Sequence, residues 1–120
     1  VPNGEKTSTA DAYAAIGEGD GKSTLSAMLS ALSECDINKI SAAMKNDFET
    51  VQRPDSPSEQ LKNRLLSLGA RAAMLSGSGA GVFGIFGSVR EAKAAKEEIE
   101  NDARAFVCAP ARRDYAYIEK

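Results

Sequence analysis

The sequence predicts an α+β fold, a two-layer sandwich in which helices cover a small, mainly antiparallel sheet. Three observations lead to this class. Apolar residues recur at helical spacing through most of the first 69 residues. Two short apolar runs then lie on either side of a glycine-rich turn, which is typical of a strand pair. A further helical segment and a last apolar run complete the order strand, strand, helix, strand.

The first two helices are predicted from start signals that precede apolar residues at helical spacing. Ser8 begins one helix, with Asp11 as an acid in the first turn. Its apolar face is Ala12, Tyr13 and Ile16. Glycines in 17–21 interrupt the pattern, and Ser23 restarts it as a cap. The stripe of this second helix is Leu25, Met28, Leu29 and Leu32.

Two more helices are expected before residue 70. Asp36 caps the first, which we expect to extend toward the turn at 53–57. Its apolar face is Ile37, Ile40, Met44 and Phe48. Ser56 begins the second, because Pro57 falls at the first helical position with an acid two residues later. Its core face is Leu61, Leu65 and Leu68, and Gly69 ends it.

Three strands are predicted in the last third of the chain. The runs at 72–75 and 82–86 form a hairpin-like pair, and 105–108 reads as a last strand. Ser88 begins the intervening helix, whose Lys and Glu residues form a solvated face. Because a sheet of three strands is small for such a sandwich, we expect another strand before Val1.

Length and composition bound the organisation. A chain of 120 residues buries one core, so residues 1–111 are expected to form one domain, followed by a polar tail at 112–120. The net charge of −2 and the scattered aromatic residues argue against nucleic acid as a partner. No apolar run is long enough for a membrane span. The absence of His excludes classical catalytic triads and the usual zinc sites.

Cys35 and Cys108 are the two cysteines, and both lie in apolar patterns. We therefore expect two buried thiols in a reducing compartment, which indicates a cytoplasmic protein. The chain starts with Val1 and shows no signal-peptide pattern, so we expect its natural N-terminus to be missing.

Two segments resemble nucleotide-binding motifs, but neither has the neighbouring secondary structure that its motif requires. Residues 21–24, GKST, resemble the end of a P-loop, but Ile16 stands where that motif needs its first glycine, and a helical pattern precedes it. Residues 79–84, GAGVFG, match the Rossmann fingerprint, yet a strand rather than a helix follows. The remaining glycine loop, 76–81, lies between two strands, where its backbone amides can converge on an anion. Taken alone, it is better explained as a tight turn that needs glycine.

Residues 61–86, LKNRLLSLGARAAMLSGSGAGVFGIF, resemble the third conserved motif of the GHMP kinases with the helix before it. Within that superfamily the 4-diphosphocytidyl-2-C-methyl-D-erythritol kinases fit best. Three segments occur in their order and spacing: KTSTADAY at 6–13, NDFE at 46–49 and MLSGSG at 74–79. The resemblance covers nearly the whole chain. One departure is that the family usually has Pro-Thr or a similar pair where this chain has Ala80 and Gly81, which removes a hydroxyl near the phosphates.

The resemblance implies a two-domain kinase of which this chain is the substrate-binding half, with the ferredoxin-like fold of GHMP C-terminal domains. Such an enzyme transfers the γ-phosphate of ATP to a hydroxyl of a cytidine diphosphate sugar alcohol in non-mevalonate isoprenoid synthesis. The family's ATP loop and catalytic Lys and Asp belong to the N-terminal domain, the expected partner of this chain. ATP and Mg²⁺ are expected there, so we predict no catalytic residue, metal ligand or cofactor in this chain, and no activity from it alone.

The resemblance also assigns site residues by position. Tyr13 matches an aromatic that stacks on the cytosine ring, although a core position would suit it equally. Ser8 and Thr9 would cap their helix or face the substrate. The glycine loop would position the substrate against the transferring phosphate through Gly77, Ser78, Gly79, Ala80 and Gly81. We assign 46–49 a structural role, with polar groups satisfying the backbone and Phe48 packed inward.

Two alternatives stay open. Another GHMP kinase, acting on homoserine, mevalonate or a sugar, would keep the glycine loop but not a stacking aromatic at Tyr13. A free-standing ligand-binding α+β module without catalysis would have a start codon just before this domain. Binding of a cytidine ligand separates the first alternative from the main hypothesis.

Overall fold

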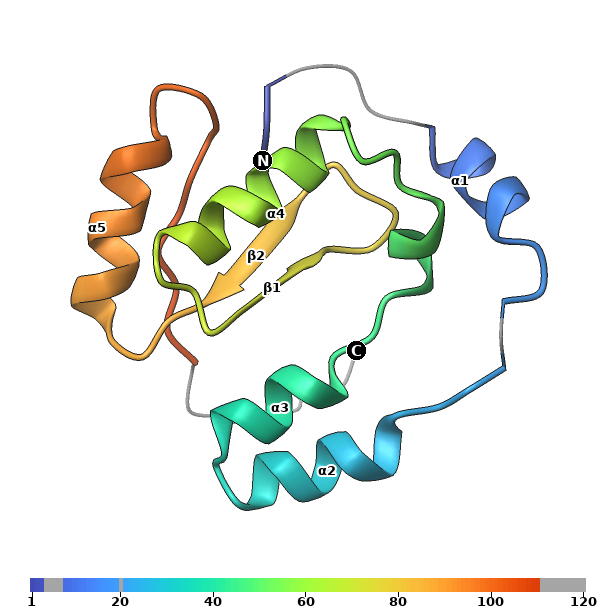
Figure 1. The fold of residues 1–120 in the computed structure, drawn as a ribbon, viewed down its shortest axis with the longest axis horizontal. Helices are drawn as coiled ribbons and strands as arrows, with labels where there is room; N and C mark the ends of the chain where they lie inside the picture. Colours follow the sequence, from blue (N-terminus) through green and yellow to red (C-terminus); the bar gives the residue numbers. More distant parts are fainter. Residues whose placement is uncertain (4–7, 20, 111–120) are drawn as a thin grey trace, which may run out of the picture.

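The computed structural model describes residues 1–3, 8–19 and 21–110. Helices, a 3₁₀ helix (η1) and two strands follow one another along the chain (Figure 1). Their bounds are α1 Thr9–Ile16, α2 Leu25–Ser33, α3 Ile37–Ala43, η1 Asp47–Val51, α4 Pro57–Ser67, β1 Ala72–Leu75, β2 Val82–Ile85 and α5 Val89–Ile99. The predicted α+β class is confirmed.

Four helices begin at the polar residue that the sequence indicated. The hydroxyls of Ser8, Ser56 and Ser88 accept hydrogen bonds from the backbone N–H three residues later, at 3.1, 3.2 and 3.2 Å. The carboxylate of Asp36 accepts two, at 2.9 and 3.1 Å. Each cap satisfies amides that have no partner inside the helix and contributes about 1 kcal/mol.

The sheet and its covering helix form the centre of the molecule. Strands β1 and β2 pair antiparallel, with Ala72 opposite Ile85 and Leu75 opposite Val82. Helix α4 packs across both strands (Figure 1). The core cluster joins α4, α5 and the segment after α5 through Leu61, Leu65, Ile99 and Ala103. The predicted apolar face of α4 therefore supplies the middle of the core.

Two helix bounds differ from the predictions. Thr24 rather than Ser23 stands at the cap of α2. Helix α3 ends at Ala43, so Met44 and Phe48 do not continue it. Instead, the side-chain oxygen of Asn46 accepts a hydrogen bond from the Phe48 N–H at 3.0 Å and begins η1. A competing polar cap therefore ends the longer helix that periodicity predicted.

The predicted strand at 105–108 is wrong, because this segment is irregular and Phe106 is 72% exposed. Pairing is limited to one antiparallel bridge, Pro2 with Ala103, beside a 2.9 Å hydrogen bond from Arg104 N–H to Val1 C=O. Within the described ranges no neighbour supplies partners for the backbone further along, and a strand needs such partners. The strand expected before Val1 stays a prediction.

The prediction of two buried thiols is also wrong. Cys35 and Cys108 are both exposed. Cys35 lies in the turn between α2 and α3 with a φ of 52°, and Cys108 lies in the irregular segment after α5. Both residues are therefore outside the helix and strand faces whose apolar pattern suggested burial.

Several further predictions can be placed. Helix α1, not a strand, precedes 21–24, so this segment is not a P-loop. Strand β2, not a helix, follows the glycines at 79–81, so this segment is not a Rossmann fingerprint. Both outcomes were predicted. The 112–120 tail, the domain boundary at 111 and the first two residues of the 6–13 motif lie outside the described residues. None of the described helices has the length and apolar character that crossing a membrane requires.

Candidate functional site

The glycine loop, 76–81, connects β1 to β2 and extends toward η1 (Figure 1). Ser76 N–H donates to Gly81 C=O at 2.8 Å, and Gly79 N–H donates to Ser76 C=O at 3.2 Å. Gly77 and Gly79 have φ values of 58° and 97°. Side chains rarely tolerate these values, so glycine is needed at both positions for conformation.

Asn46 holds the loop from the η1 side. Its side-chain nitrogen donates to Leu75 C=O at 2.8 Å and to Gly77 C=O at 2.9 Å. Since both acceptors are carbonyls, the amide nitrogen must face the loop and the amide oxygen must face Phe48 N–H. One half-buried side chain therefore caps η1 and fixes the entry to the loop.

Glu49 provides a second contact from η1. Its carboxylate accepts from Leu75 N–H at 3.0 Å and lies 3.4 Å from the Lys62 ammonium of α4. Lys62 also contacts Glu59 at 2.9 Å. Burial by itself would lower the pKa of Lys62, but the hydrogen bond to Glu59 and the charges of both carboxylates raise it above the usual value. Lys62 therefore stays charged and holds Glu49 against the end of β1.

Two hydroxyls hold the far side of the loop. The buried Ser58 of α4 donates to Ala80 C=O at 3.0 Å. The hydroxyls of Thr9 and Ser78 lie 3.2 Å apart, which joins the start of α1 to the loop across 69 positions of sequence. The loop is therefore contacted by side chains of α1 and α4 as well as by those at η1.

Adjacent backbone amides at the tip of the loop remain available. Within the described ranges, the N–H groups of Gly77 and Ser78 donate to no protein acceptor. Gly77 is exposed and Ser78 is half-buried. Neighbouring N–H groups of this kind suit an anion such as a phosphate oxygen.

The helix α1 residues divide into two roles. The Ser8 hydroxyl accepts from Asp11 N–H at 3.1 Å and donates to the Asp11 carboxylate at 2.6 Å, so it is engaged in capping. Tyr13 is 64% exposed, which rules out the core position considered for it. Its ring meets Phe48 edge to face, with centroids 4.9 Å apart and planes at 87°. Tyr13 thus presents aromatic surface to solvent while η1 supports it.

Sequence reasoning missed part of this site. It assigned 46–49 a structural role, and Asn46 does satisfy backbone groups, but the contacts to the loop were not foreseen. Ser58 gave no sequence signal beyond a serine in the first turn of a helix. The hydrogen bonds of Asn46 and Ser58 span 22 to 31 positions, a separation that no local pattern reports.

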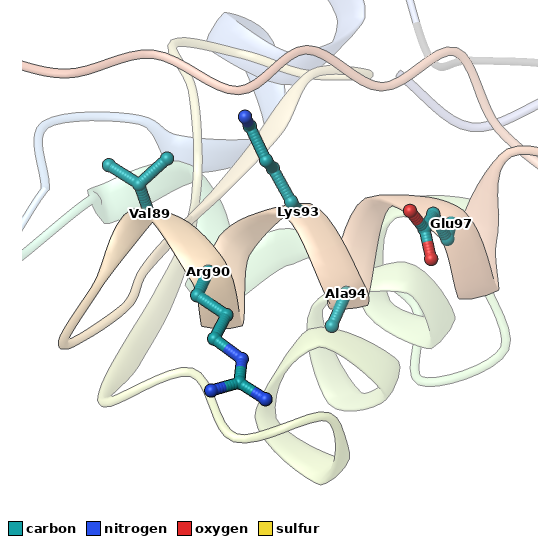
Figure 2. A pocket seen from close by; sticks show the side chains of 5 residues that line it. All are labelled: Val89, Arg90, Lys93, Ala94 and Glu97. Carbon is teal, nitrogen blue, oxygen red and sulfur yellow. The ribbon is translucent and has the colours of Figure 1, made fainter.

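A hollow on α5 does not resemble a binding site. Figure 2 shows five side chains on α5 that line a hollow, and all come from one helix: Val89, Arg90, Lys93, Ala94 and Glu97. A single helix face cannot enclose a small molecule. Nowhere in the described part of the chain do three or more His, Cys, Asp or Glu residues gather as metal ligands would.

Comparison with known proteins identifies the family. The family model described as "GHMP kinases C terminal" matches residues 28–105, about two thirds of the chain. The chain belongs to the GHMP kinase C-terminal family. The match includes η1, α4 and the glycine loop, whereas Ser8, Thr9 and Tyr13 lie before it. The family assignment made from the sequence is confirmed.

Two curated relatives carry the name 4-diphosphocytidyl-2-C-methyl-D-erythritol kinase. The protein from Geobacter metallireducens is 40% identical over 75 residues, or 62% of this chain and 27% of the relative. The protein from Syntrophotalea carbinolica is 39% identical over 77 residues, or 62% of this chain and 28% of the relative. This GHMP C-terminal chain thus spans about a quarter of the length of the relatives it matches. No solved structure matches it significantly.

Proposed function

We propose that this chain is the substrate-binding half of an ATP-dependent kinase that acts on 4-diphosphocytidyl-2-C-methyl-D-erythritol. The reaction moves the γ-phosphoryl group of ATP to a substrate hydroxyl, which loses its proton, and leaves ADP. It is a step of non-mevalonate isoprenoid synthesis, and we propose a cytoplasmic location. The names of the relatives support this choice of substrate.

One observation carries the proposal for this chain. The 3.2 Å contact between Thr9 and Ser78 brings the start of α1 to the glycine loop, so residues from two distant motifs adjoin. A cytidine diphosphate group has a flat base and a pair of phosphates. The exposed ring of Tyr13 fits the base, and the available amides of Gly77 and Ser78 fit phosphate oxygens.

The remaining residues have supporting roles in this proposal. Ser8 orients the start of α1 by capping it, and Thr9 lies between α1 and the loop. Gly79, Ala80 and Gly81 shape the loop through their backbone. Since Ala80 has no hydroxyl, its contribution is limited to the backbone, which Ser58 holds.

ATP and Mg²⁺ belong mainly to the N-terminal domain in this proposal. Loop amides suit a phosphate oxygen, but the described residues bring no carboxylate cluster together for a metal. When bound, Mg²⁺ neutralises charge that develops on the transferred phosphoryl group. This chain supplies substrate binding and orientation, and we expect no kinase activity from the 120 residues alone.

The test is a coupled assay of ADP release by the full-length protein. We expect turnover with 4-diphosphocytidyl-2-C-methyl-D-erythritol and none with homoserine, mevalonate or galactose. Turnover of one of these three instead would favour another GHMP kinase. Cytidine nucleotide binding without ATP consumption would favour a binding module.

Tyr13→Leu tests the base end of the site. We expect the KM for the cytidine substrate to rise about tenfold, because stacking on an aromatic contributes about 1–3 kcal/mol per base. Phe106→Leu is the matched control, since Phe106 is also an exposed aromatic but lies in the segment after α5. Equal KM values for both variants would remove Tyr13 from the site.

A further inference from the structure

The directions of the Gly77 and Ser78 N–H groups in the glycine loop depend on the carbonyl groups of the same peptide units. In a trans peptide unit, the C=O of one residue and the N–H of the next point in opposite directions within one plane. The Ser76–Gly77 and Gly77–Ser78 units are both trans. A hydrogen bond to the carbonyl therefore fixes where the N–H on the other side points.

Each of these carbonyls has one identified partner. Ser76 C=O accepts from Gly79 N–H at 3.2 Å, which fixes the direction of Gly77 N–H from within the loop. Gly77 C=O accepts from the Asn46 side chain at 2.9 Å, which fixes the direction of Ser78 N–H. The orientation of the Ser78 amide is thus determined from outside the loop.

Asn46 can do this because its position is itself determined. Its second donor hydrogen is directed to Leu75 C=O at 2.8 Å, and its oxygen accepts from Phe48 N–H at 3.0 Å. The side chain is therefore held at three points. Glu49 lies three residues after Asn46, in η1, and its carboxylate accepts a hydrogen bond from Leu75 N–H at 3.0 Å. The strand end next to Asn46 is therefore held as well.

We propose that Asn46 is a positioning residue that aims the Ser78 N–H at a phosphate oxygen of the bound substrate. The identity of that substrate rests on the proposed function. Asn46 itself does not contact the phosphate, because its polar atoms are engaged by Leu75, Gly77 and Phe48. Its contribution is to keep the Gly77–Ser78 peptide from rotating.

The experiment compares Asn46→Ala with Thr50→Ala in the full-length protein. Thr50 is the matched control, because its hydroxyl donates to Asp47 C=O at 2.7 Å and so stabilises η1 without touching the loop. For each variant, we would measure affinity for CDP, which has phosphates, and for cytidine, which has none. Asn46→Ala is expected to weaken CDP binding about tenfold, the effect of losing one oriented hydrogen bond to a charged group, with cytidine binding changed less than about twofold. Thr50→Ala is expected to change neither.

Equal losses for CDP and cytidine, or no loss for either, would overturn the positioning role. If Asn46→Ala does not fold, Asn46→Ser replaces it, because a serine hydroxyl can still cap η1 but is too short to reach Gly77 C=O.

A separate readout distinguishes failure of this inference from failure of the proposed function. Inorganic pyrophosphate is titrated while the amide NMR signals of Gly77 and Ser78 are followed. We expect the Ser78 signal to shift in the wild type and to shift much less in Asn46→Ala. An identical shift in both proteins would refute the role of Asn46, even if the kinase activity is established. If the wild type responds to pyrophosphate but never to CDP, and Asn46→Ala responds much less to pyrophosphate, the substrate is refuted and the role of Asn46 is supported.

Discussion

The glycine loop and helix α2 are held in place by different kinds of interaction. Side chains of Thr9, Asn46 and Ser58 hydrogen-bond the loop from three directions. Helix α2 packs on α3, and Leu25, Leu29 and Leu32 each remain more than half exposed. The loop has few apolar contacts but a determined conformation, whereas α2 has a regular conformation and an uncovered apolar face.

This difference shows that the conformation of the loop and the conformation of a helix depend on different interactions. Helix α2 forms from an amphipathic pattern and packs on α3, although much of its apolar stripe stays uncovered. The loop has no repeating backbone pattern, so its conformation depends on glycine φ values and on polar contacts from elsewhere. Substitutions should therefore change stability through apolar contacts and ligand binding through polar ones.

Leu65→Ala should give the largest effect on stability. Leu65 lies in the core of α4, and its truncation is expected to cost about 2–5 kcal/mol through lost burial and the remaining cavity. Leu29→Ala, the same change on the exposed stripe of α2, should cost less than about 0.5 kcal/mol. Urea unfolding of both variants measures the difference. Similar losses would mean that another surface covers the α2 stripe in solution.

Gly79→Ala should separate stability from binding. Gly79 and Gly17 have φ values of 97° and 63°, and an added Cβ meets nothing closer than 3.4 Å at Gly79 and nothing within 4 Å at Gly17. Either substitution should therefore cost about 1 kcal/mol through backbone strain. Only Gly79→Ala should also weaken CDP binding, which calorimetry measures. A binding loss in Gly17→Ala would show that the comparison does not isolate the loop.

Thr9→Val should have a smaller effect, because it removes only the hydroxyl contact to Ser78. We expect a loss of about 0.5 kcal/mol, at the low end for a hydrogen bond, since both groups are near solvent. Thr24→Val is the control, because the Thr24 side chain does not cap α2. Thermal unfolding measures both. An equal decrease in Tm for the two variants would contradict a specific link between α1 and the loop.

Lys62→Met should have a small effect on stability, and this effect should depend on pH. The pKa of Lys62 is raised above 10.5, so its ion pairs stabilise the folded state below that pH, and this contribution disappears as the pH rises through the raised pKa. The difference in unfolding free energy between wild type and variant should be less than about 1 kcal/mol near neutral pH and should decrease above pH 10.5. A constant difference up to pH 12 would show that packing of the side chain, not its charge, is what matters.

Sequence patterns predicted the parts of the fold that depend on near neighbours. Ser8, Asp36, Ser56 and Ser88 begin helices because each side chain reaches amides only two or three residues away. The paired strands were predicted because two apolar runs adjoin a short glycine turn. The order of these elements was sufficient for the α+β class and, with the quoted motifs, for the family.

Tertiary structure decided which segments and side chains found pairing or packing partners elsewhere in the chain. The apolar run at 105–108 has strand character but does not form a strand, because backbone pairing requires a neighbour that its own sequence cannot supply. Tyr13 could have been core or surface until the packing of α1 against η1 left it exposed. Asn46 was expected to satisfy backbone groups, and it does, but only the fold brings it within 2.9 Å of Gly77 across 31 positions. Local hydrogen bonds and periodicity are encoded over a few residues, whereas the hydrogen bonds of the glycine loop depend on the whole chain.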